Sequence, residues 1–337
     1  MNKILLFLSI FILLPGNEAH SQNLIVIQNG NNTSFYSQLS TAIASANNGD
    51  TINIPGGSFN GDITIDKTLH LIGNGHNSDS VVGGLITQIN GNVLLIPGAS
   101  NGSIRGINLK GNIVCSNTSS ISNYVISRNA ILQLSLSSTF AFGIISENVI
   151  YGVIDGSSGY AINNGFFNNI IGSQFYRLGP NNIFKNNIFM YPVNAGVNQV
   201  KQCVFENNIF FSGIVNYVYN NGITNCIFNN NLFIEYINIP YESNLGIDNI
   251  TSQPQNSIFT NQTGINFNYD HDYNLKDTCP GKNGGTDGKD IGLYGGLYPW
   301  KDGSLPQNPQ IKFKQISNTT DQNGNLQINM VVKAQNN

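Results

Sequence analysis

The sequence predicts an all-β solenoid, a chain that winds into stacked coils joined by parallel strands. The first observation is a short phrase that recurs six times between residues 126 and 233: an apolar residue, a spacer, a polar residue, Asn, and two mostly apolar residues. The second observation is that successive phrase asparagines lie 19, 21, 18, 21 and 23 residues apart, a repeat length typical of solenoids. These asparagines are Asn129, Asn148, Asn169, Asn187, Asn208 and Asn231.

The third observation is the residue type inside each phrase. Ile, Val and Phe surround each Asn, and these residues favour strands. Asn tolerates the left-handed backbone that a sharp bend between two strands requires, and its amide can bond to the Asn of the next coil. A leucine-rich repeat has a similar period, but its L-x-x-L-x-L pattern is absent here. We therefore expect parallel strands and a structural ladder of six stacked asparagines.

The first 21 residues have the features of a signal peptide. A Lys near the start precedes an apolar run of about 11 residues, too short to span a bilayer. Ala19, His20 and Ser21 fit the small-x-small rule, so we expect cleavage near Ser21 and a mature chain that begins at Gln22. No later stretch is apolar enough for a membrane span. We expect a secreted or cell-surface protein.

The next segment predicts a cap at the start of the solenoid. Residues 34–46 place Phe35, Leu39 and Ile43 on one helical face, and Ser34 could cap that helix. Residues 51–55 then predict a strand, and further short strands follow to residue 115. A helix over the first coil would block an exposed strand edge.

With this cap, the six phrases resemble the right-handed parallel β-helix proteins of the pectin-lyase-like superfamily. The resemblance rests on the phrases and on the stretch GDTINIPGGSFNGDITIDKTLHLIGNG at residues 49–75. It implies a single-stranded right-handed parallel β-helix with an N-terminal capping helix. Residues 281–300, rich in Gly and ending in Pro299 and Trp300, resemble the closing segment of such proteins.

The C-terminal third departs from the phrase. Residues 240–263 predict a loop-rich excursion, and residues 266–275 predict a last coil strand. Residues 310–333 predict a β-hairpin around Asn323 and Gly324 that caps the C-terminal end. We therefore expect a signal peptide over 1–21, a capped β-helix over 22–300 and a hairpin extension over 301–337.

Composition narrows the classes of partner. The net charge is −3 and no basic tract is present, which argues against nucleic acid. Four cysteines in 337 residues do not form a disulfide framework. Cys203 and Cys226 occupy matching positions in neighbouring repeats, so we expect them to stack as two buried residues, although a disulfide between them stays open. We expect a monomer without a cofactor.

The superfamily resemblance implies polysaccharide lyases and hydrolases, so we searched for their chemistry. A lyase would use Ca²⁺ held by acids, and a hydrolase two carboxylates about 5–10 Å apart. Asp270 and Asp272, on one face of a predicted strand, are the best candidates for a catalytic or metal site. Charged residues beside the ladder predict a solvated turn column of mixed sign; they are Arg128, Glu147, Lys185 and Glu206.

Two functions follow from these observations. The first is a non-catalytic exported protein that binds a glycan or another cell-surface component through a long polar face, with exposed aromatics that we expect to include Tyr160, Tyr176, Tyr217 and Tyr219. The second is a divergent polysaccharide lyase or glycoside hydrolase that acts on an acidic polysaccharide. The few charges in the repeats favour the first function.

Overall fold

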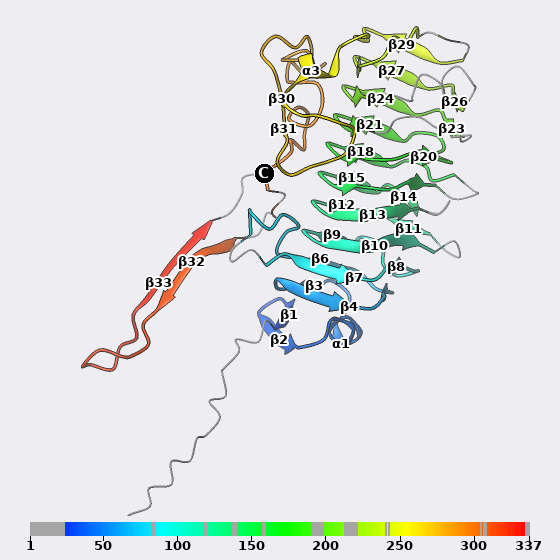
Figure 1. The fold of residues 1–337 in the computed structure, drawn as a ribbon. Helices are drawn as coiled ribbons and strands as arrows, with labels where there is room; N and C mark the ends of the chain where they lie inside the picture. Colours follow the sequence, from blue (N-terminus) through cyan, green and yellow to red (C-terminus); the bar gives the residue numbers. More distant parts are fainter. Residues whose placement is uncertain are drawn as a thin grey trace, which may run out of the picture.

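The computed structural model describes residues 24–81, 85–116, 120–136, 140–156, 160–190, 199–211, 222–239, 241, 243–303, 305 and 309–333. The expected signal peptide at 1–21, and the expected aromatics Tyr217 and Tyr219, lie outside these residues. The described chain is a parallel β-solenoid of about 8 turns, as the phrase predicts (Figure 1). No helix within these residues is long and apolar enough to cross a membrane.

Two long sheets run along the solenoid, and each turn adds a strand to both, except that the last turn adds one to the first sheet and only a bridge to the second. Sheet A contains, in spatial order, β2 (Asn32–Tyr36), β1 (Ile25–Asn29), β3 (Asp50–Asn53), β6 (Leu69–Ile72), β9 (Ser103–Arg105), β12 (Val125–Ser127), β15 (Ile144–Ser146), β18 (Gly165–Phe167), β21 (Ile183–Lys185), β24 (Val204–Glu206), β27 (Ile227–Asn229) and β29 (Leu245–Ile247). Its strands from β3 to β29 are all parallel.

Sheet B lies beyond the bend that follows each strand of sheet A. Its main path contains β4 (Gly57–Asn60), β7 (Thr87–Asn90), β10 (Asn108–Cys115), β13 (Ala130–Ser135), β16 (Val149–Ile150), β19 (Ile170–Ile171), β22 (Ile188–Phe189), β25 (Ile209–Phe210) and β28 (Leu232–Phe233). Its side branches are β5 (Ile63–Ile65), β8 (Val93–Leu95), β17 (Ile154–Asp155) and β20 (Phe175–Tyr176). Two small parallel pairs complete the coils: β11 (Ile121–Ser122) with β14 (Phe140–Ala141), and β23 (Val200–Lys201) with β26 (Ile223–Thr224).

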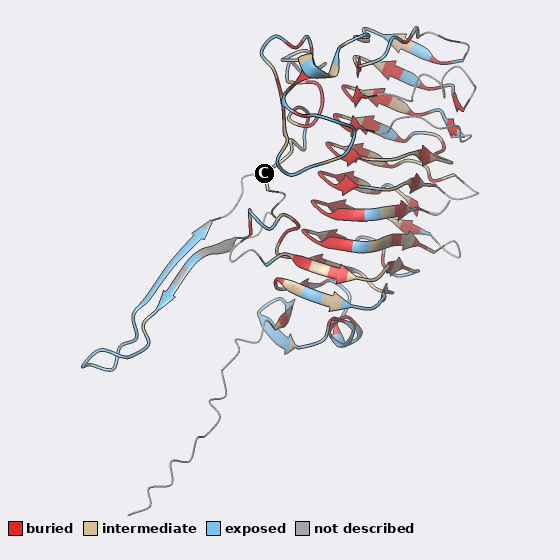
Figure 2. Cartoon of the chain, viewed as in Figure 1, coloured by how far each residue is buried: buried red, intermediate tan, exposed pale blue. Residues whose placement is uncertain are grey.

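Identical side chains stack inside the solenoid because the strands are in register. Phe184 and Phe205 lie with ring centroids 4.8 Å apart and their planes 10° from parallel. This spacing matches the separation of neighbouring strands. A second stack joins Phe189 to Phe210 at 4.6 Å. The core is thus built from repeated layers, which Figure 2 shows as buried residues along the inner side of both sheets.

The predicted asparagine ladder is present and buried. The Nδ2 of each ladder Asn donates to the Oδ1 of the ladder Asn in the following coil, over 3.0–3.1 Å. The same Oδ1 also accepts the backbone N–H of the donating Asn. A seventh member, Asn249, accepts both bonds from Asn231. Asn249 follows β29, so the predicted excursion at residues 240–263 contains one more coil.

The left-handed bend lies one residue earlier than the sequence suggests. The residues that directly precede the ladder asparagines, and not the ladder asparagines themselves, have φ between 48° and 59°. They are Arg128, Glu147, Asn168, Asn186, Asn207, Asn230 and Asp248. The ladder Asn is selected for its amide, and its predecessor supplies the bend. We call these seven residues the outer column.

A second ladder, which the sequence analysis missed, lies at the bend before sheet A. Asn164 N–H donates to the Oδ1 of Asn182 at 2.9 Å, and Cys226 N–H donates to the Oδ1 of Asn244 at 3.0 Å. Between them, Cys203 N–H bonds the Sγ of Cys226 at 3.3 Å. The predicted stacking of the cysteines is confirmed; both are buried free thiols that replace two asparagines in the ladder.

The N-terminal cap differs from the prediction. Residues 34–36 belong to strand β2, and Phe35 is 61% exposed instead of facing the core. The helix α1 is shorter (Leu39–Ser45), and Gln38 rather than Ser34 stands at its N-cap, without a side-chain bond. The antiparallel pairing of β2 with β1 overrides the helical period of residues 34–36. Helix α1 still buries Leu39 and Ile43 against the end of the core.

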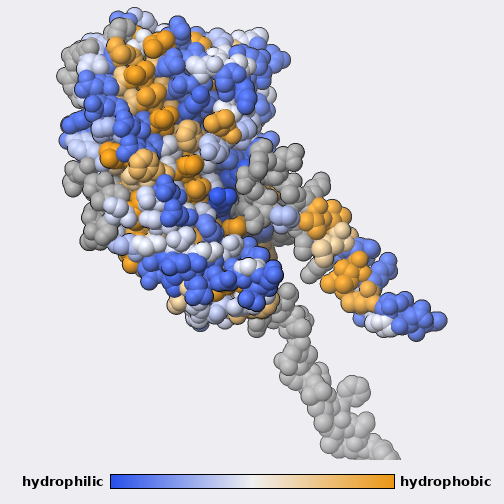
Figure 3. All heavy atoms as spheres, turned by 180° about the vertical axis from the view of Figure 1, so that it is seen from behind, coloured by the Kyte–Doolittle hydropathy of each residue, from blue (hydrophilic) through white to orange (hydrophobic). Residues whose placement is uncertain are grey.

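Two C-terminal elements also differ. Residues 272–275 form β31 (Asp272–Leu275), which pairs antiparallel with β30 (Phe259–Asn261) after the short helix α3 (Gln255–Ile258), so it is not a coil strand. The predicted hairpin exists as β32 (Gln310–Ile316) and β33 (Ile328–Lys333). It projects away from the solenoid and does not cap its C-terminal end (Figures 1 and 3). Apolar side chains on both of its strands, such as Phe313 at 49% and Ile328 at 52%, are exposed.

Candidate functional site

A return segment runs back along the solenoid over the outer column, and we call its described residues, 281–303 and 305, the strap. Side-chain amides of the outer column donate to strap backbone carbonyls or hydroxyls. The bonds are Asn230 to Gly284 O (2.6 Å), Asn207 to Thr286 Oγ1 (3.0 Å), Asn186 to Gly292 O (3.1 Å) and Asn168 to Leu293 O (2.8 Å). The paired asparagines of the later phrases thus have two roles: the inner one builds the ladder and the outer one binds the strap.

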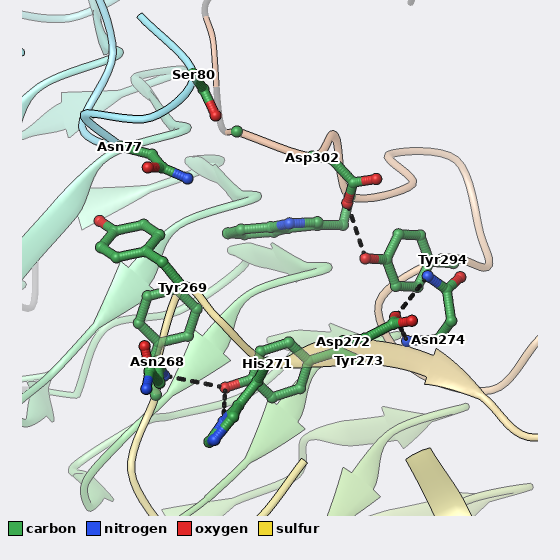
Figure 4. Close-up of a pocket in the computed structure, with 13 residues that line it drawn as sticks. Asn77, Ser80, Asn268, Tyr269, His271, Asp272, Tyr273, Asn274, Tyr294 and Asp302 are labelled. Atoms are coloured by element: carbon green, nitrogen blue, oxygen red, sulfur yellow. Dashed lines mark hydrogen bonds between the residues drawn. The ribbon is translucent and has the colours of Figure 1, made fainter. Parts of the chain in front are cut away.

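The strap closes one wall of a cavity of about 360 Å³. The other walls are the loop at residues 77–80, after β6, and residues 267–274 around β31. Three segments far apart in the sequence therefore meet at one place, beside the solenoid. Figure 4 shows Asn77 of the first segment beside Tyr269, Ser80 pointing toward the strap, and Asp302 and Tyr294 of the strap on the far side.

Two carboxylates face this cavity. Asp302 Oδ1 accepts the Tyr294 hydroxyl at 2.9 Å, and Asp272 Oδ1 accepts the N–H and the amide of Asn274 at 2.9 and 2.8 Å. Both carboxylates lie beside the phenol of Tyr294 (Figure 4). Burial, then the charge of Asp302 and then that of Asp272, raise the pKa of Tyr294. The Tyr294 hydroxyl therefore stays protonated and donates the hydrogen bond that holds the Asp302 carboxylate in place. No Lys or Arg is among the described residues that line the cavity.

Aromatic side chains form much of the remaining wall. Phe267 packs parallel to Tyr273, with centroids 5.9 Å apart, and edge-on to Tyr269 at 4.8 Å. Trp300 and Tyr294 line the cavity from the strap. Burial raises the pKa of Tyr273 to about 12, so its hydroxyl remains a neutral donor and acceptor. Flat apolar faces and fixed polar groups therefore alternate around the cavity.

A buried histidine fixes the position of Tyr269. His76 is 2% exposed, and its Nδ1 lies 2.6 Å from the Tyr269 hydroxyl, which also donates to the His76 carbonyl at 3.1 Å. The other ring nitrogen, Nε2, is buried and has no hydrogen-bond partner in the part of the chain that the structure describes. Burial lowers the pKa of His76 to about 3, so this imidazole is neutral at ordinary pH.

The structure separates the two predicted site residues. Asp272 opens β31 and lines the cavity, but Asp270 lies in the turn before that strand, is exposed, and does not line it. The two therefore do not share a strand face as the sequence suggested. Asp302 is the second acid of the cavity instead. Among the described residues, no three His, Cys, Asp or Glu side chains gather as a metal site would require.

The charged residues beside the ladder are also not a solvated column. Arg128 and Glu147 are 3% and 5% exposed and form an ion pair of 3.0 Å. Lys185 and Glu206 pair at 2.6 Å and are partly buried. The strap covers this bend, since Arg128 Nη1 donates to the Leu305 carbonyl at 2.8 Å. The sequence showed the charges but not the segment that covers them.

No known protein family matches the chain, and no curated protein or solved structure is detectably similar to it.

Proposed function

We propose that the protein binds a glycan in the cavity between the strap and β31, as a non-catalytic exported protein. The observation that carries this proposal is the lining: aromatic faces next to carboxylates and amides. A sugar ring presents an apolar C–H face that packs on an aromatic ring, and hydroxyls that donate to carboxylates and accept from amides. Trp300, Asp272 and Asn77 offer these three kinds of contact.

The charge of the cavity selects among glycans. Asp272 and Asp302 face it without a lining Lys or Arg among the described residues. A uronic acid or sulfate at this place would be repelled by both carboxylates. The cavity therefore favours a neutral or amino sugar, a narrower class than the acidic polysaccharides of the superfamily resemblance. We retain from that resemblance the right-handed winding and the pectin-lyase-like ancestry as parts of the proposal.

A glycan array followed by calorimetry with the best neutral glycan tests this proposal. We expect Trp300→Ala to raise Kd by about tenfold or more, because burying a large apolar side chain contributes about 1.5–3 kcal/mol. Tyr236→Ala is the matched control, since Tyr236 is 68% exposed and does not line the cavity. Equal binding by the two variants, or an array without any bound glycan, would exclude the cavity as a glycan site.

A second candidate is a glycoside hydrolase, favoured by the presence of two carboxylates beside Tyr294. In that case one acid would protonate the leaving oxygen and the other would act as base or nucleophile. Incubation of the bound glycan with the protein, assayed for new reducing ends, separates the two functions. A hydrolase should lose turnover in both Asp272→Asn and Asp302→Asn, whereas a pure binding protein gives no product with any variant.

A further inference from the structure

A second, smaller cavity lies on the outer face of sheet A. The register places Arg105, Ser127 and Ser146 side by side on β9, β12 and β15. Because Ile126, between Val125 and Ser127, is fully buried, its neighbours face outward. Three polar side chains from three successive coils therefore form one outward column.

Apolar and strap residues surround this column. Val125 and Ile144, at the first positions of the same strands, line one side of a cavity of about 190 Å³. Tyr298 of the strap lines it too, and the Tyr298 ring is held 5.2 Å from Phe167, the next residue along the column. This volume is below the roughly 300–1,000 Å³ of sites for whole small molecules, so the cavity suits a single chemical group.

The charges around the cavity are unbalanced. Three cations, Arg128, Lys301 and Arg105, act on the one carboxylate of Glu147. Arg128 holds that carboxylate in a buried ion pair. Arg105 is close enough to act on Glu147 but forms no ion pair with a carboxylate of the described residues, and its Nε is buried there with no hydrogen bond.

Two further observations agree with a positive site whose charge is only partly compensated. Burial and then the charge of Arg128 lower the pKa of Arg105, and the Glu147 carboxylate, which also lines the cavity, offsets only part of this effect. Burial and the charge of Arg105 likewise lower the pKa of His70 on the neighbouring strand β6. An anion in the cavity would relieve both effects. The hydroxyls of Ser127 and Ser146 lie beside Arg105 as potential donors.

We propose that the cavity formed by Arg105, Ser127, Ser146 and Tyr298 binds an oxyanion, either a free ion or the anionic substituent of a glycan. The guanidinium fork matches the paired oxygens of carboxylate, sulfate or phosphate groups. The serine and tyrosine hydroxyls supply further donors to the same group. This oxyanion site is separate from the cavity lined by Asp272 and Asp302. The oxyanion site favours a negatively charged group, which the two carboxylates of the other cavity would repel.

Titration with inorganic sulfate and inorganic phosphate by calorimetry tests the proposal without any glycan. We expect one saturable site, and at least about tenfold weaker binding in Arg105→Gln, because a hydrogen bond to a charged group contributes that much or more. Lys110→Gln is the control, because Lys110 is exposed on β10 and this substitution removes the same charge away from the cavity. Non-saturable binding, or equal binding in the two variants, would overturn the proposal.

A second variant guards against misfolding of Arg105→Gln. Ser127→Ala combined with Ser146→Ala keeps Arg105 and should weaken sulfate binding several-fold; unchanged binding would contradict the proposed donors. A sulfated polymer compared with its desulfated form distinguishes the sources. If the sulfated polymer competes with inorganic sulfate, the site binds the anionic substituent of a glycan. If inorganic sulfate binds but the sulfated polymer does not compete with it, the site binds a free oxyanion.

Discussion

Replacing one buried ladder asparagine should destabilise the protein measurably. Asn187 is fully buried; its Oδ1 accepts the backbone N–H and the amide of Asn169, and its Nδ2 donates to Asn208 Oδ1 and to the Phe166 carbonyl. Nδ2 also donates to the Lys185 carbonyl at 3.2 Å. Asn187→Leu removes all five bonds and leaves the N–H of Asn169 buried without its acceptor. Each orphaned group costs about 1–3 kcal/mol, and the added apolar burial offsets part of the loss, so we expect about 2–4 kcal/mol.

Urea unfolding followed by far-ultraviolet circular dichroism measures this loss. Asn256→Leu is the control, because Asn256 is exposed on α3 and should change the free energy of unfolding by less than about 0.5 kcal/mol. Asn249→Leu should have an intermediate effect, since half-buried Asn249 ends the ladder and water can replace its bonds. Equal midpoints for Asn187→Leu and Asn256→Leu would refute the buried ladder.

Three further predictions test single contacts. Arg128→Met should cost about 3–5 kcal/mol in thermal unfolding, because it leaves Glu147 buried without its cation, and adding Glu147→Leu should recover most of that loss; no recovery would mean that the pair is not the cause. The pKa of His76 in the folded protein lies below its unfolded value, so its contribution to the free energy of unfolding is present above about pH 6.5 and is lost as pH falls toward 3. Between pH 7 and pH 5 the wild type should therefore lose about 2 kcal/mol more stability than His76→Gln. Parallel curves of stability against pH for the two proteins would disprove this. Cys226→Asn should change stability by less than about 1 kcal/mol, because an amide oxygen can accept the Cys203 N–H as the sulfur does, and a loss above about 3 kcal/mol would contradict this equivalence.

The repeated layers were predictable because their signal recurs in every coil. Each phrase places the same side chains at the same bend, so Asn129 and Asn208 could be assigned to one ladder without coordinates. The seventh coil was missed because the stretch before Asn249 has Leu and Gly where other phrases have Ile or Phe. The second ladder was missed because Cys203 and Cys226 interrupt its asparagines.

The cavity could not be predicted in the same way, because it depends on contacts without a repeat. Asp272 and Asp302 are 30 residues apart in sequence, and only the path of the strap brings them together. That path is set by backbone carbonyls that accept from outer-column amides, as Gly292 does from Asn186. Because every residue carries a backbone carbonyl, the sequence does not show which residues act as these acceptors. The single Trp in a Gly-rich segment was the available hint.

Trp300 offers the most direct measurement of the proposed glycan site, because it is the only tryptophan of the chain and it lines the cavity. Its fluorescence should shift in a saturable way when a neutral glycan from the array is added. The same titration with Asp302→Asn should saturate at a clearly higher concentration, and with Tyr236→Ala at the wild-type concentration. A glycan that binds by calorimetry yet leaves the Trp300 emission unchanged would contradict the account.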